Sequence, residues 1–168
     1  MPRFSSPPPR RTTTRRVADA LNKRDDFSNP KQAAYLALVR TASDLGAPLA
    51  ELFRTHGITM SSYNALRVLR GHHPSGLPSQ DIGPQLLDRG ADITRLVDRL
   101  VKQGWAERSR DEADGRVKRV QITRKGLGLL KRLDEPVMAI HDAQFSRLSE
   151  AELDRLMRLL EKARDEPG

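Results

Sequence analysis

Apolar residues recur at steps of three and four along most of the chain, which is the spacing of helices with one buried face. A long first helix is predicted from Lys31, and Thr59 is a suitable N-cap for a second. A short third helix is predicted from Ser79, and a fourth over "ADITRLVDRLVKQG", ended by Gly104. The residues expected to face inward from the third helix are Ile82, Leu86 and Leu87.

The periodicity changes after the fourth helix. "WAERSR" and "VKRVQIT" are predicted as short strands joined by "DEADGR", because Val120 and Ile122 share one face of the second strand while alternate residues point away. A fifth helix is expected from near Thr123. A capping box of Ser149 and Glu152 predicts the start of the last helix.

The order of these elements predicts a mainly α fold with a small β-hairpin. The third and fourth helices are joined by a tight turn and followed at once by the hairpin, the order of a winged helix-turn-helix with N- and C-terminal helices. The apolar stripes near both chain ends exceed what a small core needs, which favours dimerisation; the alternative is that they only cover the core of the same subunit. The expected boundaries are a disordered basic arm at 1–16, an N-terminal dimerisation region at 17–58, a winged helix-turn-helix lobe at 59–126, and C-terminal dimerisation helices at 127–168.

The fourth helix has one apolar and one polar face. The residues expected to hold it to the core are Ile93, Leu96, Val97, Leu100 and Val101, and those on the other side are Thr94, Arg95, Asp98, Arg99 and Lys102. Arginine can bond the edge of guanine as a fork, and threonine can hold a phosphate. The alternative is a solvated face with the intrahelical pairs Asp98–Lys102 and Asp92–Arg95.

Composition narrows the class of protein. Thirty Lys and Arg against twenty-two Asp and Glu give a net charge of +8, which favours nucleic acid or another anionic partner, although solubility alone can explain it. The absence of cysteine excludes disulfides and thiolate chemistry. No apolar run approaches the ~18 residues of a membrane span. These observations predict an intracellular protein without membrane contact.

The segment "DITRLVDRLVKQGWAERSRDEADGRVKRVQITRKG" resembles the core signature of the MarR family of bacterial transcriptional regulators. In that family T-R-x-x-x-x-L on the recognition helix leads into G-W/L-V-x-R, a D-x-R turn and V-x-L/I-T-x-x-G. The matching positions are Thr94, Arg95, Leu100, Gly104, Trp105, Glu107, Arg108, Asp114, Arg116, Val120, Ile122, Thr123 and Gly126. Looser similarity spans roughly 31–165. Many relatives have arginine where Gly115 stands.

The resemblance implies a cytoplasmic, nucleoid-associated homodimer that binds a pseudo-palindromic double-stranded DNA site, and a repressor released by a small aromatic or phenolic ligand. It implies that Arg116 enters the minor groove, oriented by Asp114, and that Arg108 is also at the DNA surface. Tyr35, Tyr63 and Arg67 are then candidates for the ligand pocket. The candidates for dimerisation are Leu38, Leu45, Leu153, Leu156 and Leu160.

The acidic cluster Asp111, Glu112 and Asp114 has other interpretations. An EF-hand needs an oxygen ligand where Ala113 stands and a distal glutamate that is absent, and a metal nuclease needs converging carboxylates with a catalytic partner. A surface hairpin with local ion pairs is a further alternative. We therefore expect no metal and no cofactor. No nucleophile–base pair suggests an enzyme, and an architectural DNA-binding protein without ligand control remains the alternative function.

Overall fold

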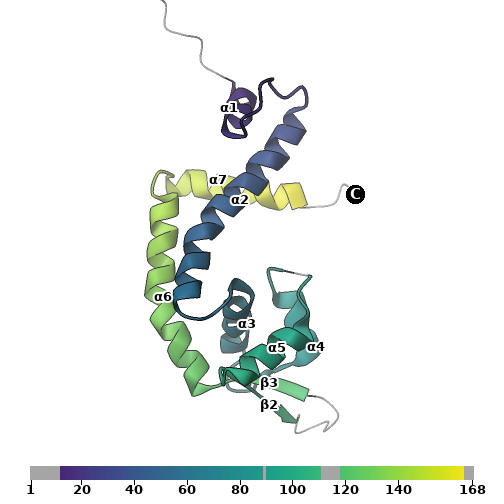
Figure 1. Cartoon of the computed structure of the whole chain (residues 1–168), viewed down its shortest axis with the longest axis vertical. Coiled ribbons are helices and arrows are strands. Elements are labelled where there is room, and N and C mark those ends of the chain that lie inside the picture. The colour runs from purple at the N-terminus through teal and green to yellow at the C-terminus, as the bar shows by residue number, and fades with distance from the viewer. Residues whose placement is uncertain (1–11, 89, 111–117, 165–168) are drawn as a thin grey trace, which may run out of the picture. The chain divides into compact units, whose positions relative to one another are not determined.

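The computed structural model describes residues 12–88, 90–110 and 118–164 (Figure 1). The chain divides into two compact units, 1–47 and 48–168, which are considered separately. Helix α2, Pro30–Thr55, has residues in both units.

The N-terminal unit contains helix α1, Thr13–Ala20, and the first part of α2. Thr12 caps α1 by accepting a hydrogen bond from the Arg15 N–H at 3.2 Å. The predicted arm therefore ends earlier than residue 16, because its last residues form the start of a helix; residues 1–11 lie outside the described residues. The sequence "VADALNKRDDF" predicts a short helix from Val17, and the structure begins that helix earlier, at Thr13.

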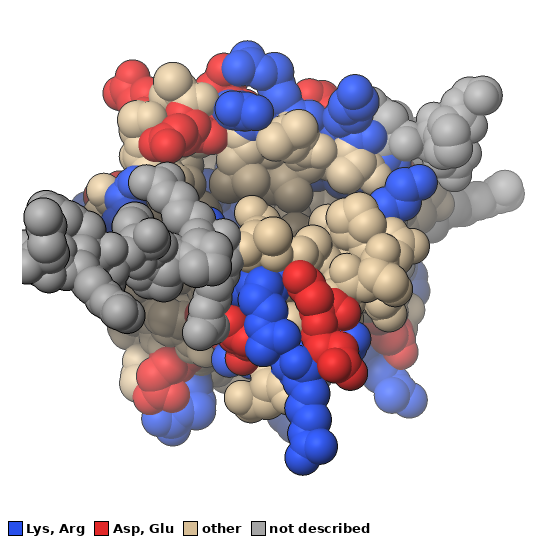
Figure 2. Space-filling model, turned by 90° about the horizontal axis from the view of Figure 1, so that it is seen from above, with Lys and Arg blue, Asp and Glu red and all other residues tan. Residues whose placement is uncertain are grey.

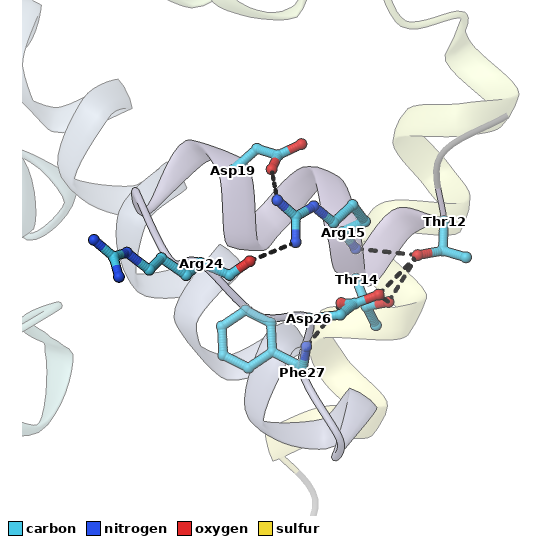
Figure 3. A network of polar contacts seen from close by, with 7 residues as sticks. All are labelled: Thr12, Thr14, Arg15, Asp19, Arg24, Asp26 and Phe27. Carbon is cyan, nitrogen blue, oxygen red and sulfur yellow. Dashed lines mark hydrogen bonds and ion pairs between the residues drawn. The ribbon is translucent and has the colours of Figure 1, made fainter. Parts of the chain in front are cut away.

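The loop between α1 and α2 is held to α1 by the hydrogen bonds of one carboxylate, Asp26 (Figure 3). Its Oδ2 accepts hydrogen bonds from the hydroxyls of Thr12 and Thr14 at 3.2 and 3.3 Å, and its Oδ1 accepts one from the Phe27 N–H at 2.7 Å. Burial raises the pKa of Asp26, but these hydrogen bonds and the charge of Arg15 outweigh it and leave that pKa below its ordinary value. Beneath the loop lies a small apolar cluster of Ala18, Phe27 and Ala33, with Val17, Leu21 and Leu36 packed against it.

The C-terminal unit contains the predicted winged helix-turn-helix. After α2 come α3 (Met60–Gly71), β1 (Leu77–Pro78), α4 (Ser79–Ile82), the 3-10 turn η1 (Gly83–Gln85), α5 (Ile93–Lys102), β2 (Ala106–Arg110), β3 (Lys118–Ile122), α6 (Arg124–Phe145) and α7 (Glu150–Arg164). Thr59 caps α3 through the Ser62 N–H, and Asp92 caps α5 through the Arg95 N–H. The mainly α fold with a small sheet is therefore confirmed, and α4 and α5 form the helix-turn-helix.

The sheet has three antiparallel strands in the order β1-β3-β2. Strands β2 and β3 are the predicted hairpin, and Val120 is paired with both Leu77 and Arg108. Strand β1 was not predicted, because two residues are too few to show alternation. Gly76, just before β1, has φ +68°, and a Cβ there would lie 2.8 Å from the Val120 carbonyl oxygen.

One core contains buried side chains of α3, α5, the sheet and α6. Its fully buried side chains include Leu66, Leu69, Val97, Leu100, Val120, Leu130 and Leu133. The inward positions predicted for Ile82 and Leu86 are confirmed, whereas Leu87 is 86% exposed and its predicted inward position is wrong. The physical reason is that the backbone becomes extended at Leu86, so helical spacing no longer applies one residue later.

The end of α5 is bound to the start of α6. Gly104 adopts φ +70° after α5, as its predicted capping role requires. Thr123 accepts a hydrogen bond from the Gly126 N–H at 3.2 Å and donates one to the Gly104 carbonyl at 2.7 Å. A Cβ at Gly126 would lie 2.3 Å from the Trp105 carbonyl oxygen. This close approach fixes α5 relative to α6.

Two further contacts define the C-terminal helices. Arg70 of α3 donates to both carboxylate oxygens of Asp134 of α6, at 3.0 and 2.8 Å. The predicted capping box of α7 is confirmed: the Ser149 N–H donates to Glu152 at 2.9 Å, and the Glu152 N–H donates to the Ser149 hydroxyl at 3.4 Å. Among the described helices, none combines the length and apolar character needed to cross a bilayer.

Candidate DNA-binding surface

Helix α5 presents the polar face that its sequence predicts. Leu96, Val97 and Leu100 are buried and hold the helix against the core. The exposed residues are those proposed to face DNA, namely Thr94, Arg95, Asp98, Arg99 and Lys102. A helix held by one face and exposing cations and a hydroxyl on the other has the form of a groove-reading helix.

The charged side chains of α5 have identifiable partners. Arg95 is 86% exposed and pairs with Asp92 at 3.2 Å, as its spacing predicts. Asp98, which its spacing pairs with Lys102, is bonded to Arg108 of β2, whose Nη2 donates to Oδ1 at 2.6 Å. The recognition helix and the root of the wing are therefore joined by an ion pair that helical spacing could not predict.

A hollow of about 540 Å³ lies beside α5. It is lined by Ser79 and Gln80 of α4, Ile93, Thr94, Val97 and Asp98 of α5, Arg108 of β2 and Lys118 of β3. Ser79, Gln80 and Lys118 were not among the predicted DNA-binding residues. The helix-turn-helix order could have indicated Ser79 and Gln80, because the first helix of that motif begins there. Lys118 is the first residue of β3 and shares a face with Val120 and Ile122, so alternation could have indicated that it lies on the side of the sheet toward α5.

The tip of the predicted wing lies outside the described residues. Asp114 and Arg116, with the acidic cluster and Gly115, all fall within 111–117. The hairpin strands are described up to Arg110 and from Lys118, and they pair antiparallel with Arg108 opposite Val120. Within the described part of the chain, no three His, Asp or Glu side chains gather in a way that could hold a metal ion.

Two of the three predicted ligand-pocket residues meet. Arg67 donates a hydrogen bond to the Tyr63 hydroxyl at 3.1 Å, and both line a cavity of about 340 Å³ in the C-terminal unit. Its other lining residues are Leu49, Phe53, Met60, Asn64, Leu87, Val137, Met138 and His141. Phe53 and Tyr63 stack with ring centroids 4.4 Å apart. Tyr35 belongs to the N-terminal unit, is 65% exposed and is not among the lining residues.

None of the predicted dimerisation residues is fully buried within the chain. Leu38 on α2 is 48% exposed, and the others, Leu45, Leu153, Leu156 and Leu160, are half-buried. Helix α7 also exposes Met157 and Leu159, which are 62% and 56% exposed. Apolar side chains left in contact with water on terminal helices are typical of surfaces that a partner covers.

Basic side chains do not dominate the face of the chain that Figure 2 shows. Figure 2 shows one face of the chain, on which Lys and Arg side chains lie next to Asp and Glu side chains. The excess of +8 is therefore not collected into a single basic area on that face. The candidate DNA-binding surface is therefore assigned from the exposed polar face of α5 and from the hairpin.

The fold and this surface define a winged helix-turn-helix DNA-binding protein. A family model described as MarR family matches residues 56–117. The Bacillus subtilis (strain 168) uncharacterized HTH-type transcriptional regulator YkoM is 33% identical over 111 residues, covering 66% of this chain and 70% of that protein.

Solved structures agree with this assignment. A MarR transcription factor from Planctomyces limnophilus is 40% identical, with a TM-score of 0.62, and the match covers 80% of this chain and 98% of that one. The S. aureus MepR–DNA complex is 25% identical, with a TM-score of 0.69, covering 77% and 95%. The chain belongs to the MarR family. It is a DNA-binding transcriptional regulator and not an enzyme.

Proposed function

We propose that this regulator binds a pseudo-palindromic double-stranded site with α5 in the major groove. The observation that carries the proposal is the division of α5 into a buried apolar face and an exposed face with Thr94, Arg95, Arg99 and Lys102. Arg95 reads a base edge, and the other side chains contact phosphates or neighbouring bases. The solved complex of the relative MepR with DNA supports this use of the fold.

The hollow beside α5 supports a second set of contacts. Its polar lining includes the amide of Gln80 and the ammonium group of Lys118, whereas the Ser79 hydroxyl already donates to the Lys118 carbonyl at 3.3 Å. We assign Gln80 and Lys118 to the DNA backbone, because amides and lysines commonly bond phosphate oxygens. They would set the register of α5 without selecting a sequence.

The wing is proposed to add a minor-groove contact. Arg116 would enter that groove and Asp114 would orient it, as the family resemblance implies. The antiparallel pairing of β2 and β3 supports this role, because it sets Arg110 and Lys118, which flank 111–117, opposite each other.

Two copies are proposed to bind one site. The incompletely buried leucines Leu38, Leu45, Leu153, Leu156 and Leu160 would form the subunit interface. A twofold dimer presents two recognition helices to half-sites roughly 34–36 Å apart. The protein would act on the nucleoid, in the bacterial cytoplasm.

An effector is proposed for the cavity that Tyr63 and Arg67 line. The cavity has an apolar wall of aromatic and aliphatic side chains, and a guanidinium and a phenol hydroxyl 3.1 Å apart. These features suit a small aromatic carboxylate or phenol, whose ring would lie on the apolar wall and whose oxygen would bond Arg67. Tyr35 is not assigned to this cavity, because it belongs to the N-terminal unit and is not among the lining residues. Occupancy would favour a form of the dimer with low affinity for the operator, which relieves repression.

The decisive experiment is selection of random duplexes by the purified protein, followed by affinity measurements on the enriched sequence and on a shuffled duplex. Enrichment of an inverted repeat supports the regulator. An architectural DNA-binding protein would enrich no sequence and would bind both duplexes equally. Addition of benzoates, salicylates and phenols to the bound complex then tests the effector proposal by release of DNA.

A further inference from the structure

The ion pair between Asp98 and Arg108 joins the two elements that are proposed to read DNA. Asp98 is on the exposed face of α5, where a carboxylate repels phosphates. Arg108 is on β2, which forms the root of the wing. Their atoms Oδ1 and Nη2 are 2.6 Å apart, and the two side chains are 57% and 38% exposed.

The position of Arg108 on the sheet explains this contact. Arg108 is paired directly with Val120, and residues opposite each other in an antiparallel pair share one face. Val120 is fully buried on the face that meets the core. Arg108 therefore leaves β2 on the side of the sheet that packs against α5, and its guanidinium emerges at the edge to meet Asp98.

The neighbouring strand is fixed by separate contacts. Arg119 of β3 donates a hydrogen bond to the Gly76 carbonyl at 3.2 Å, and the Ser79 hydroxyl donates to the Lys118 carbonyl at 3.3 Å. These bonds hold β3 to the segment around β1 and α4. The Asp98–Arg108 pair connects β2 directly to the recognition helix.

We infer that Asp98 is a positioning residue, which holds the root of the wing, on β2, in a fixed position against α5 through Arg108 before DNA binds. This inference rests on the proposed DNA-binding function. Holding the wing before binding removes part of the ordering entropy that association otherwise costs. The pairing also offsets the repulsion between the Asp98 carboxylate and phosphates.

The test uses variants that separate positioning from charge. Asp98→Asn removes the charge and keeps the shape, whereas Asp98→Glu keeps the carboxylate and can restore the pair. Glu107→Gln is the matched control, because Glu107 is also exposed but is on the opposite face of the same strand, where β-alternation points it away from α5. If the loss of one negative charge is all that affects DNA binding, Asp98→Asn and Glu107→Gln should change the affinity equally.

Affinity is measured on the duplex most enriched by the wild-type protein and on a shuffled duplex, at one salt concentration. Asp98→Asn is expected to weaken binding to the enriched duplex about threefold to tenfold, with little loss on the shuffled one. Asp98→Glu should retain most of the affinity, and Glu107→Gln should bind both duplexes as tightly as the wild type or slightly more tightly. Asp98→Asn and Arg108→Ala together should cost less than the sum of the two single losses.

A second measurement is made without DNA. Hydrogen exchange of the β2 and β3 amides should be faster in Asp98→Asn than in Glu107→Gln, because the wing root has lost its tie to α5. The inference is overturned if Asp98→Asn matches Glu107→Gln in both affinity and exchange. If the wild-type protein enriches no sequence, the proposed function fails, and equal exchange rates in the two variants would then overturn the positioning role independently.

Discussion

Arg95 is the residue on which base reading by α5 depends most directly. Its guanidinium is 86% exposed and lies 3.2 Å from Asp92, the residue that also caps the helix. An exposed ion pair of this kind is weak, so a guanine edge can replace the carboxylate at little cost. Residue-scale tests of recognition should therefore begin with this side chain.

Replacement of Arg95 by alanine is expected to weaken binding to the selected duplex by about 1–3 kcal/mol, and to weaken binding to shuffled DNA much less. Fluorescence anisotropy at a single salt concentration measures both. Arg40→Ala is the matched control, because it removes one exposed, ion-paired arginine outside the DNA-binding lobe. Equal losses on the two duplexes would show that Arg95 contacts the backbone and does not read bases.

Glu152 gives a residue-scale test of pH dependence. Hydrogen bonds from the Ser149 N–H and hydroxyl lower the pKa of Glu152, while burial opposes the shift. A depressed folded-state pKa means that this stabilisation is present above the ordinary glutamate pKa and is lost as the pH falls through the lowered value. Acid titration by NMR should show fraying at the start of α7 over that range. Ser149→Ala removes the hydroxyl but keeps the N–H, so it should reduce this pH dependence without abolishing it, and Glu161→Gln, at an exposed position later in α7, should preserve it.

At the scale of elements, the contact between α6 and the end of α5 depends on glycine. Gly126→Ala is expected to destabilise the fold by about 1–3 kcal/mol, because its Cβ would lie 2.3 Å from the Trp105 carbonyl oxygen. Gly128→Ala, two residues later in the same helix, meets nothing closer than Arg132 at 3.9 Å and should stabilise α6 by about 0.5–1 kcal/mol. Urea denaturation compares the two variants. Similar stabilities would mean that the close approach can relax without cost.

The elements differ in how far sequence could predict them. Helix α5 was predictable because Asp92, the apolar stripe and Gly104 all give local signals. The pairing of Asp98 with Arg108 was not predictable from the sequence. It joins a helix to a strand, and neither the helical period nor the strand period of the apolar pattern indicates a contact between two elements. Strand β1 was missed because it is two residues long. The wrong orientation of Leu87 came from extending helical spacing past the point where the helix had ended.

At the scale of the whole molecule, binding is expected to require two copies. Replacing Leu153 and Leu156 with glutamate places charges in the proposed interface and should split or unfold the dimer. The sedimentation coefficient and the DNA affinity should then both fall, although Arg95 is intact. Arg155→Glu introduces the same charge at an exposed position of α7 and serves as the control. A monomer that still binds one half-site tightly would contradict the dimeric mode of binding.

The N-terminal arginines are expected to raise DNA affinity by contacting phosphates, and such contacts make the affinity depend on salt concentration. Deletion should remove residues 1–11 and spare Thr12, because Thr12 caps α1 and bonds Asp26. This segment carries three arginines and no acidic residue. If all three contact phosphates in both subunits of the proposed dimer, the slope of log affinity against log salt concentration should become shallower by roughly 5. Replacement of the segment by an uncharged sequence of equal length is the control, and an unchanged slope in both would exclude a DNA contact.

The hydrogen bonds of Thr123 limit which segment can be exchanged when the recognition helix of a relative is transplanted to change the operator. One hydroxyl caps α6 and also bonds the carbonyl of Gly104, directly after α5. If residues 93–102 alone are exchanged, Thr123 and Gly104 remain those of this protein. The transplanted helix must then fit the position that their hydrogen bond imposes. Such a graft also removes the carboxylate that holds Arg108 unless the donor helix has an acid at the same position. The smallest segment that can be exchanged is therefore 92–126, which contains the helix, the hairpin and Gly126. Shorter exchanges should change the orientation of the transplanted helix as well as the DNA sequence that the protein prefers.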